Sequence, residues 1–292
     1  MTSRANVLRL FQQEDINFLL TNRIPRVALT RFMGWFSKLE NPFVRRISIA
    51  LWRFFCDVDL TESSDAEFSS LHAAFIRRLR PDSRTIDVNP DVLASPCDGI
   101  VGAFGRISDC RAWQIKGFDY RIDDLLGDSE DAADFRDGWF VTLRLTAGMY
   151  HRFHAPHDLA VERVRYISGD TWNVNPIALK RIERLFCKNE RAPISVRLDA
   201  TGDRLILVPV AAVLVASIRM PFLDPVRGAR AGGERVVPCD AHFAKGDEMG
   251  WFEHGSTIVM LAPSCWRPSE GLAEGAPVRL GERLLVKTAG RS

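Results

Sequence analysis

The spacing of apolar residues divides the chain into a helical first part and a β-rich second part. Up to about residue 80, apolar residues recur at the period of an amphipathic helix, as in Phe32, Trp35, Phe36, Leu39 and Phe43. From residue 86 onward, short β-branched runs alternate with turn signals built on Gly and Asp. These runs predict strands over residues 140–145, 161–167, 194–198, 205–218, 258–261 and 278–286, and helices over residues 122–135 and 175–186.

This change of pattern predicts an α+β fold with two regions. Residues 1–80 form a helical, amphipathic region, and residues 81–292 form a β-rich core that ends, after Pro263, in a short tail with one strand. At 292 residues, 46% of them hydrophobic and 26% charged, the chain can bury a large core as one domain with an appendage. A disordered or fibrous protein is excluded.

Basic residues gather in the helical region, although the net charge of the whole chain is only +2. Between residues 16 and 55 the single acid Glu40 stands against Arg23, Arg26, Arg31, Lys38, Arg45, Arg46 and Arg53. Composition leaves two interpretations open: the region lies in the headgroup layer of a membrane, or it packs on the core with its arginines in solvent. The longest uncharged apolar run, residues 208–218, is about half of what a membrane-spanning helix needs. We therefore expect no spanning segment.

The cysteines indicate a reducing compartment. Six cysteines lie far apart without a CxxC pair, and no secretory leader is recognisable, so we expect free thiols in a cytoplasmic protein. His151 and His154 form an H-x-x-H pair, but a zinc site needs a third protein ligand at a recognisable spacing. We expect neither a metal site nor a nucleic-acid partner.

Three short segments carry candidate chemistry. His151 and His154 follow a predicted strand in TAGMYHRFHAP, and Asp98 precedes a glycine in SPCDGIVG. Each has an ordinary alternative, since a histidine can be structural and Asp-Gly is a common turn. Together with Ser256, however, Asp98 and His154 supply an orienting carboxylate, a general base and a nucleophile.

The residues around Ser256 do not match the nucleophile elbow of a hydrolase. That motif is G-x-S-x-G, whereas His254 and Ile258 stand at its glycine positions here. Gly255 instead comes directly before the serine, and its lack of a Cβ leaves its carbonyl open to the neighbouring hydroxyl. The sequence therefore favours attack by Ser256 on its own preceding peptide bond.

The segments SPCDG, YHRFHAP and KGDEMGWFEHGSTIVMLAP resemble the signature segments of the phosphatidylserine decarboxylase proenzymes, which are pyruvoyl-dependent enzymes. Further similarity is visible in QIKGFDYRIDDLLGD, YISGDTWNVNP and RLFCKNER, so the resemblance extends from about residue 15 to residue 265.

Two residues depart from the family pattern. His254 stands where the family usually has Leu, and Cys97 stands where it usually has Ala, which bears on the rate of maturation.

The resemblance implies a proenzyme that cuts itself between Gly255 and Ser256. Asp98, His154 and Ser256 would form the self-cleavage triad, and Ser256 would become a covalent pyruvoyl group that serves as the cofactor. The fragments 1–255 and 256–292 would stay associated. The mature enzyme would decarboxylate phosphatidylserine to phosphatidylethanolamine through a Schiff base at residue 256, with His151 as proton donor.

The implied substrate also favours the membrane interpretation of residues 1–80, because a diacyl lipid does not easily leave its bilayer. We expect a peripheral enzyme on the cytoplasmic face of the cell membrane, attracted to an anionic surface. A homodimer is a family-level expectation, and Arg152 and Lys188 are candidate cations for the substrate phosphate. The alternatives are a noncatalytic paralogue that binds lipid surfaces without maturing and an atypical serine hydrolase with an uncut chain.

Overall fold

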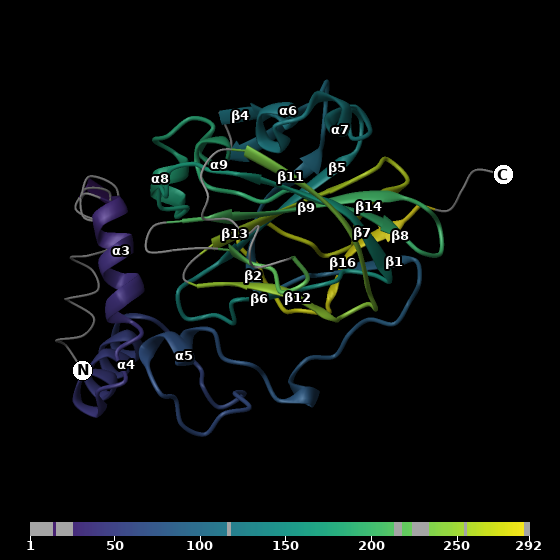
Figure 1. Cartoon of the computed structure of the whole chain (residues 1–292). Helices are drawn as coiled ribbons and strands as arrows, with labels where there is room; N and C mark the ends of the chain where they lie inside the picture. Colours follow the sequence, from purple (N-terminus) through teal and green to yellow (C-terminus); the bar gives the residue numbers. More distant parts are fainter. Residues whose placement is uncertain are drawn as a thin grey trace.

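Within the described part of the chain, an eight-stranded antiparallel sheet forms the centre of the molecule (Figure 1). The structure is a computed structural model that describes residues 14–15, 26–115, 118–212, 218–223, 234–253 and 256–288. The strand order is β11 (Glu234–Phe243), β7 (Leu159–Ile167), β8 (Ile194–Leu198), β9 (Arg204–Ala211), β13 (Ser256–Ala262), β5 (Trp139–Leu145), β2 (Gly99–Arg106) and β15 (Pro277–Val278). The predicted strands at 140–145, 161–167, 194–198 and 258–261 are confirmed.

Strand β13 lies inside this sheet and is buried along its whole length. Its sequence, STIVMLA, is a nearly continuous apolar and β-branched run, as expected for a strand that is covered on both faces. It pairs in register with β5 on one side and with β9 on the other. The first residue of β13, Ser256, is therefore held by two neighbouring strands.

Three smaller sheets accompany the large sheet in the described residues. They are β1 (Val92–Ala94), β16 (Arg283–Lys287) and β14 (Trp266–Pro268); β10 (Ile218–Arg219), β12 (Glu248–Phe252) and β6 (Arg152–His154); and β3 (Arg111–Ile115) with β4 (Phe118–Arg121). The prediction of a C-terminal tail with one strand was wrong. Residues after Pro263 supply β14, β15 and β16, whose short strands join two different sheets and give too few alternations for a clear sequence signal.

Two predicted helices and two predicted strands are each divided in the structure. The predicted strand at 278–286 falls into β15 and β16, which belong to different sheets. Residues 122–135 form α6 (Ile122–Leu126) and α7 (Ser129–Ala133), because Gly127 ends the first helix at a φ of 70° and the Asp128 side chain caps the second. Residues 175–186 fall into α8 (Pro176–Leu179) and α9 (Leu185–Lys188). The predicted strand at 205–218 ends as β9 at Ala211, and Ile218 belongs to β10 in another sheet.

The described part of the N-terminal region contains helices, as predicted, but residues 56–70 form turns and irregular backbone. It contains α3 (Arg26–Phe36), α4 (Pro42–Phe55), α5 (Leu71–Phe75) and the 3₁₀-helix η1 (Pro81–Ser83), whereas the predicted helical run at 16–20 lies outside the described residues. Asn41 starts α4 by accepting hydrogen bonds from two backbone N–H groups, followed by a proline at the first helical position. The predicted α+β class is confirmed.

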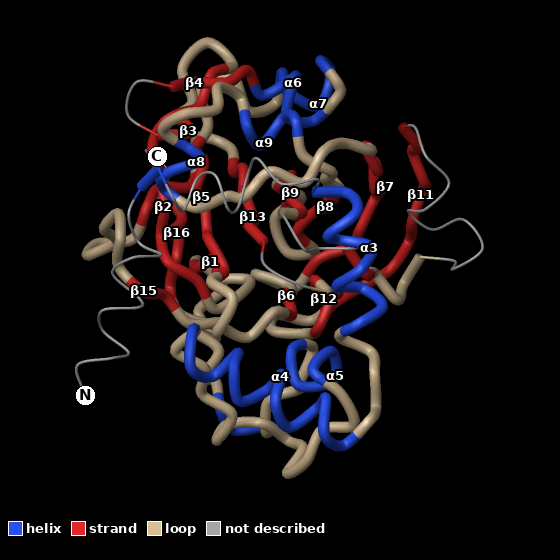
Figure 2. Tube along the Cα trace, turned by 90° about the vertical axis from the view of Figure 1, so that its left-hand side faces the viewer, coloured by secondary structure: helices blue, strands red, loops and turns tan. Residues whose placement is uncertain are grey.

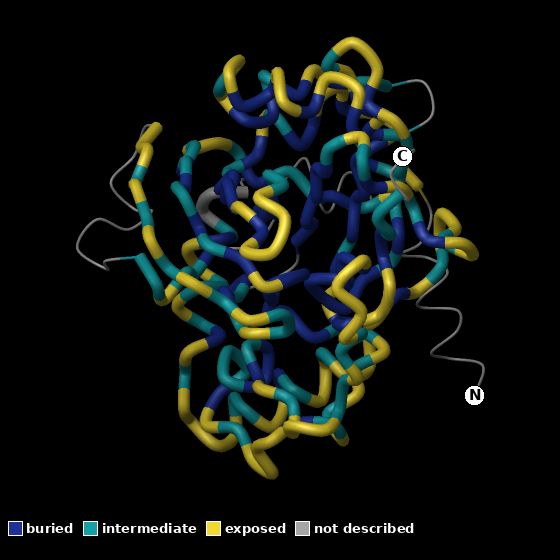
Figure 3. Tube along the Cα trace, turned by 90° about the vertical axis from the view of Figure 1, so that its right-hand side faces the viewer, coloured by how far each residue is buried: buried dark blue, intermediate teal, exposed yellow. Residues whose placement is uncertain are grey.

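Helices α4 and α5 lie together at one end of the molecule, next to β6 and β12 (Figure 2). The indole N–H of Trp52 donates to the Ala147 carbonyl at 3.0 Å, so α4 is fixed to the segment that follows β5. Buried positions run through the sheet layers, whereas the α4–α5 end carries many exposed positions (Figure 3). None of the helices described here is long and apolar enough to cross a membrane.

Candidate active site

Ser256 is a buried serine at the end of the central strands. It is 0% exposed and pairs with Leu145 at the end of β5 and with Ala211 at the end of β9. Its Oγ has no hydrogen-bond partner among the described residues. A buried hydroxyl without a partner is costly. Thr257 and several other buried hydroxyls share this feature, and Ser256 differs from Thr257 in lining a cavity. Gly255, the other residue of the expected cleavage site, and His254 lie outside the described residues.

Strand β6 brings both candidate histidines next to the segment that leads to Ser256. His154 pairs with Glu248 in β12, and the Phe252 N–H donates to the His151 carbonyl at 2.9 Å. Because Phe252 is the last residue of β12 and β13 begins shortly after it, the chain passes from the histidines to Ser256 within a few residues. Sheet pairing therefore accounts for the closeness of two segments about a hundred residues apart in sequence.

The hydrogen bonds of His154 fix its tautomer. Its Nδ1 lies 2.8 Å from the Gly246 carbonyl, which can only accept, so Nδ1 carries the proton. Its Nε2 then accepts from the Tyr150 hydroxyl at 3.0 Å. Burial lowers the pKa of His154 below its ordinary value, although the bond to Gly246 opposes this. His154 is therefore a neutral imidazole with its lone pair on Nε2, the form that a general base requires.

His151 is buried and packs against Phe75 of helix α5, with tilted rings whose centroids are 4.1 Å apart. Its Nδ1 donates to the Met149 carbonyl at 2.9 Å, so Nδ1 carries the proton in the neutral form. Phe75 also lines the cavity that contains Ser256. His151 thus stands behind a wall of that cavity.

Asp98 directly precedes β2, and in the sheet only β5 lies between β2 and β13. At the usual spacing of strands, its backbone lies about 10 Å from that of Ser256. It is also close to His154, whose N–H donates to the Pro96 carbonyl at 2.8 Å. The three candidate residues therefore gather in one part of the fold, not in separate places.

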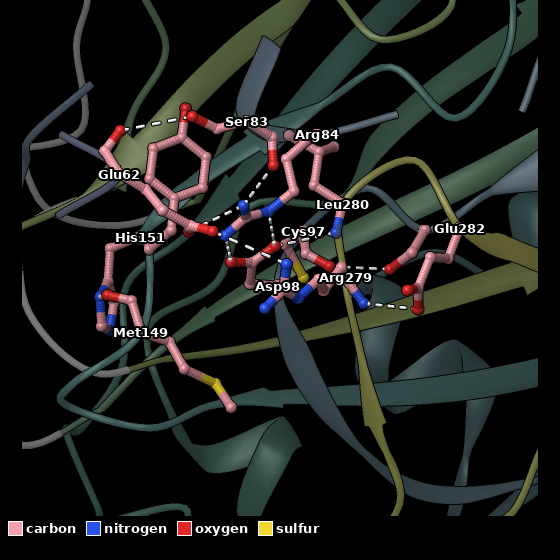
Figure 4. A network of polar contacts seen from close by, with 12 residues as sticks. Glu62, Ser83, Arg84, Cys97, Asp98, Met149, His151, Arg279, Leu280 and Glu282 are labelled. Atoms are coloured by element: carbon pink, nitrogen blue, oxygen red, sulfur yellow. Dashed lines mark hydrogen bonds and ion pairs between the residues drawn. The ribbon is translucent and has the colours of Figure 1, made fainter. Parts of the chain in front are cut away.

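The hydrogen bonds expected within the triad are nevertheless absent among the described residues. Arg84 Nε and Nη2 donate to the two carboxylate oxygens of Asp98 at 2.9 and 2.5 Å, and the Leu280 N–H donates to the first of them at 2.9 Å (Figure 4). His154 uses Gly246 and Tyr150 instead. In this state the carboxylate is held by arginine rather than by imidazole.

Arg84 is the centre of a buried charge network (Figure 4). Its guanidinium also contacts Glu62 at 2.8 Å and donates to the Ser83 carbonyl at 2.6 Å. The hydrogen bond to Asp98 raises the pKa of Arg84 above its ordinary value, so the guanidinium stays charged. Cys97, next to Asp98, is fully buried, and burial raises the pKa of its thiol. It is a neutral packing residue.

A cavity of about 400 Å³ extends from Ser256 to the helical region. Its walls are mainly apolar and include Met33, Trp52, Leu71 and Phe75 from the N-terminal helices and their connections. Asn173, Val174 and Asn175 line another side. Residues 1–80 thus supply part of the cavity and are more than an attached surface helix. No group of three potential metal ligands occurs among the described residues.

Sequence reasoning missed several residues of this site. Arg84 and Tyr150 make the hydrogen bonds described above. Of the two, only Tyr150 could have been found from the sequence, because it stands beside His151 in the motif YHRFH. Arg152, a candidate for phosphate binding, is buried against Glu248, with Nη1 and Oε1 2.5 Å apart, and donates to the Ile76 carbonyl. It does not line the cavity, and neither does the other candidate, Lys188.

Comparison with known proteins decides the family. A family model for phosphatidylserine decarboxylase matches residues 71–286, and the chain is similar to three curated relatives that each bear the name phosphatidylserine decarboxylase proenzyme. The relative from Brevibacillus brevis is 32% identical over 280 residues (92% of this chain and 97% of the relative). Those from Halorhodospira halophila and Haemophilus influenzae strain Rd are 38% and 31% identical, covering 89% and 90% of this chain and 90% and 93% of the relatives.

The chain belongs to the phosphatidylserine decarboxylase family. The family predicted from the motifs is confirmed, as are the predicted class of enzyme, a decarboxylase, and the pyruvoyl dependence of that family. The word proenzyme in the relatives' names denotes a precursor chain. The helical residues 26–70 precede the part that matches the family model, but alignments covering about nine tenths of this chain extend into them.

Proposed function

We propose that this chain is a phosphatidylserine decarboxylase that produces its own pyruvoyl group by cutting itself between Gly255 and Ser256. The observation that carries the proposal is the buried Ser256 hydroxyl, which has no hydrogen-bond partner in the described residues and adjoins a mainly apolar cavity. A hydroxyl in this position can attack without first giving up a stable hydrogen bond. The residues around Ser256 therefore fit a pyruvoyl group derived from it.

In the proposed first stage, Ser256 Oγ adds to the Gly255 carbonyl carbon and the peptide C–N bond breaks, which leaves an ester and a free amine. His154 Nε2 takes the hydroxyl proton and returns it to the amine. Removal of the Cα proton of residue 256 then breaks the Cβ–O bond and expels the Gly255 carboxylate. The resulting dehydroalanine tautomerises to an imine, and hydrolysis releases ammonia and leaves the pyruvoyl ketone.

Asp98 is the residue we assign to stabilise the imidazolium of His154 during this transfer. Its charge already acts on the His154 ring, because Asp98 is one of the groups that oppose the lowering of the His154 pKa by burial. A hydrogen bond from His154 Nδ1–H to Asp98 requires Arg84 to release or share the carboxylate and Nδ1–H to leave the Gly246 carbonyl. Tyr150 must also yield Nε2 to the Ser256 hydroxyl. The hydrogen-bond pattern thus fits a precursor that is close to, but not in, the reactive arrangement.

Once formed, the pyruvoyl group supplies the electron sink that decarboxylation of the serine headgroup requires. His151 is assigned as the proton donor to the substrate carbon, because its ring packs on Phe75, which lines the cavity that contains residue 256. To act as the donor, His151 must be in its imidazolium form, with a second proton on Nε2, because Nδ1 is bonded to the Met149 carbonyl. Residues 256–292 stay with residues 1–255 because β13 is buried between β5 and β9.

The helical region supports a peripheral position on an anionic membrane. Large apolar side chains are exposed on α3 and α4: Phe32, Trp35, Phe43, Ile47, Leu51, Phe54 and Phe55. Arg45, Arg46 and Arg53 stand on α4 as well. Apolar residues that enter the headgroup layer, with cations facing anionic lipids, would place the cavity mouth at the lipid surface. With free thiols throughout, the cytoplasmic face of the cell membrane is the location we propose.

Release of carbon dioxide tests the proposed function directly. Purified protein mixed with vesicles that contain phosphatidylserine labelled at the serine carboxyl should release labelled carbon dioxide, and the Ser256→Ala variant should release none. His151→Ala should still cut its chain but decarboxylate poorly. The matched control is His242→Ala, which changes an exposed histidine of strand β11 and should turn over normally. A folded wild-type protein that releases no carbon dioxide from this lipid would refute the proposal.

A further inference from the structure

Arg144 lines the same cavity as Ser256 and is the charged residue among its described lining residues. It is the penultimate residue of β5, and its neighbour Leu145 pairs directly with Ser256. From the dimensions of an antiparallel pair, the Cα atoms of Arg144 and Ser256 are about 6 Å apart. The pleat directs the two side chains to opposite faces, and both reach the cavity because it surrounds the end of the strand, from Arg144 to Ala147.

The guanidinium of Arg144 has no hydrogen bond or ion pair with any residue that the structure describes. Two other buried arginines of this protein do have such partners: Arg191 donates to four backbone carbonyls, and Arg152 pairs with Glu248. Burial lowers the pKa of Arg144, and no carboxylate counters this effect. A partly buried cation without an anion carries a desolvation cost, which an anionic ligand in the cavity would offset.

We propose that Arg144 binds the phosphodiester of the serine lipid and thereby presents the lipid's amine to residue 256. This inference rests on the proposed function. In the serine headgroup, the amine and the phosphorus are separated by two carbons and one oxygen, about 5 Å at ordinary bond lengths. Arg144 and Ser256 line the same cavity, so a headgroup of this length can contact both. The planar guanidinium also suits two oxygens of one phosphate.

The substrate carries a second anion, the serine carboxylate, and the chemistry argues against it as the partner of Arg144. The carboxylate loses its charge as carbon dioxide departs, so a salt bridge to it would stabilise the ground state more than the transition state and slow the reaction. The phosphodiester keeps its charge from substrate to product. An arginine on the phosphodiester therefore holds the lipid without opposing the chemical step.

Two substrates, one with a phosphate and one without, distinguish binding of the phosphodiester by Arg144 from binding of the carboxylate. One is dioctanoyl phosphatidylserine, and the other is O-decylserine, which keeps the amine and the carboxylate but has no phosphate. Each is assayed by carbon dioxide release in detergent micelles with wild type, Arg144→Gln, Arg144→Lys and the control Arg235→Gln. Arg235 is exposed on strand β11, so its substitution removes the same charge far from the cavity.

Arg144→Gln should lower kcat/KM for the phospholipid about 10- to 100-fold, mainly through KM, as expected for the loss of hydrogen bonds between charged groups. For O-decylserine, Arg144→Gln and wild type should agree. Arg144→Lys should recover part of the loss, and Arg235→Gln should behave as wild type with both substrates. Self-cleavage, read by intact mass, should be normal in all variants and shows that each one is folded.

An unchanged KM for the phospholipid in Arg144→Gln would overturn the inference. Equal losses on both substrates would also overturn it, because they would place Arg144 at the amine or the carboxylate. If Arg144→Gln fails to mature, the comparison is made with Arg144→Lys, which must show a loss confined to the phospholipid. A wild-type chain that stays uncut and inactive refutes the proposed function itself. If the wild type is cut and active and Arg144→Gln has the same kcat/KM for the phospholipid, only the role of Arg144 is refuted.

Discussion

Trp35 offers a sharp test of the membrane-facing surface. Its side chain, on helix α3, is 61% exposed. A tryptophan presents about 250 Å² of surface, so about 150 Å² is available for insertion, and full transfer at about 25 cal/mol per Å² contributes about 4 kcal/mol. A ring that only partly enters the headgroup layer contributes about half of this. Each arginine near an anionic surface contributes about 1 kcal/mol, so the aromatic contribution exceeds that of any single cation.

The assay is sedimentation of the protein with vesicles of phosphatidylcholine containing phosphatidylserine. Trp35→Ser should weaken the partition coefficient by about 30-fold or more, since about 1.4 kcal/mol corresponds to a factor of ten. The matched control is Trp113→Ser, because Trp113 is 52% exposed on strand β3, outside the helical region. Equal losses for the two variants, or no loss for Trp35→Ser, would refute the assignment of α3 and α4 to the membrane.

Three further predictions concern the residues around Asp98 and His154. Arg84→Gln, made in a Ser256→Ala background so that one uncut chain is compared, should lower the free energy of unfolding in urea by about 3 kcal/mol or more, because it leaves the buried Asp98 carboxylate unpaired. Tyr150→Phe frees His154 Nε2, so a time course of chain cutting on gels should be no slower than wild type. Because burial lowers the pKa of His154, its neutral form persists as the pH falls, and the cutting rate should stay level from pH 8 through about 6.5 and decline only below that value. A decline centred at or above pH 6.5 would contradict the pKa argument.

The sequence was most informative where one signal dominated. Continuous apolar runs, such as the one in β13, gave the central strands. The division of residues 122–135 into two helices depends on Gly127 and the cap Asp128, whose turn signal was outweighed by the helical period on either side. The segment after Pro263 was underestimated because its strands are short and pair with distant partners such as β1. Long-range pairing of this kind leaves no local pattern.

Some residues of the site could likewise be predicted from the sequence, and others could not. Short motifs identified Asp98, His154 and Ser256, and the fold brings all three into one region by pairing β5 with β2 and β13 and by placing β6 next to the segment before Ser256. The partner of Asp98 could not be predicted, because Arg84 lies in a connecting segment with no periodic relation to β2. Arg144 looked like an ordinary strand residue, and only its place in the cavity and its missing counterion make it a candidate.

Intact mass of the purified protein tests the central claim most directly. The account predicts two species with the masses of residues 1–255 and 256–292, the smaller with a ketone in place of its first amine, and a single uncut chain for Ser256→Ala and His154→Ala. A folded wild-type chain that keeps the mass of all 292 residues would contradict the account. A Ser256→Ala chain cut at the same bond would contradict it equally.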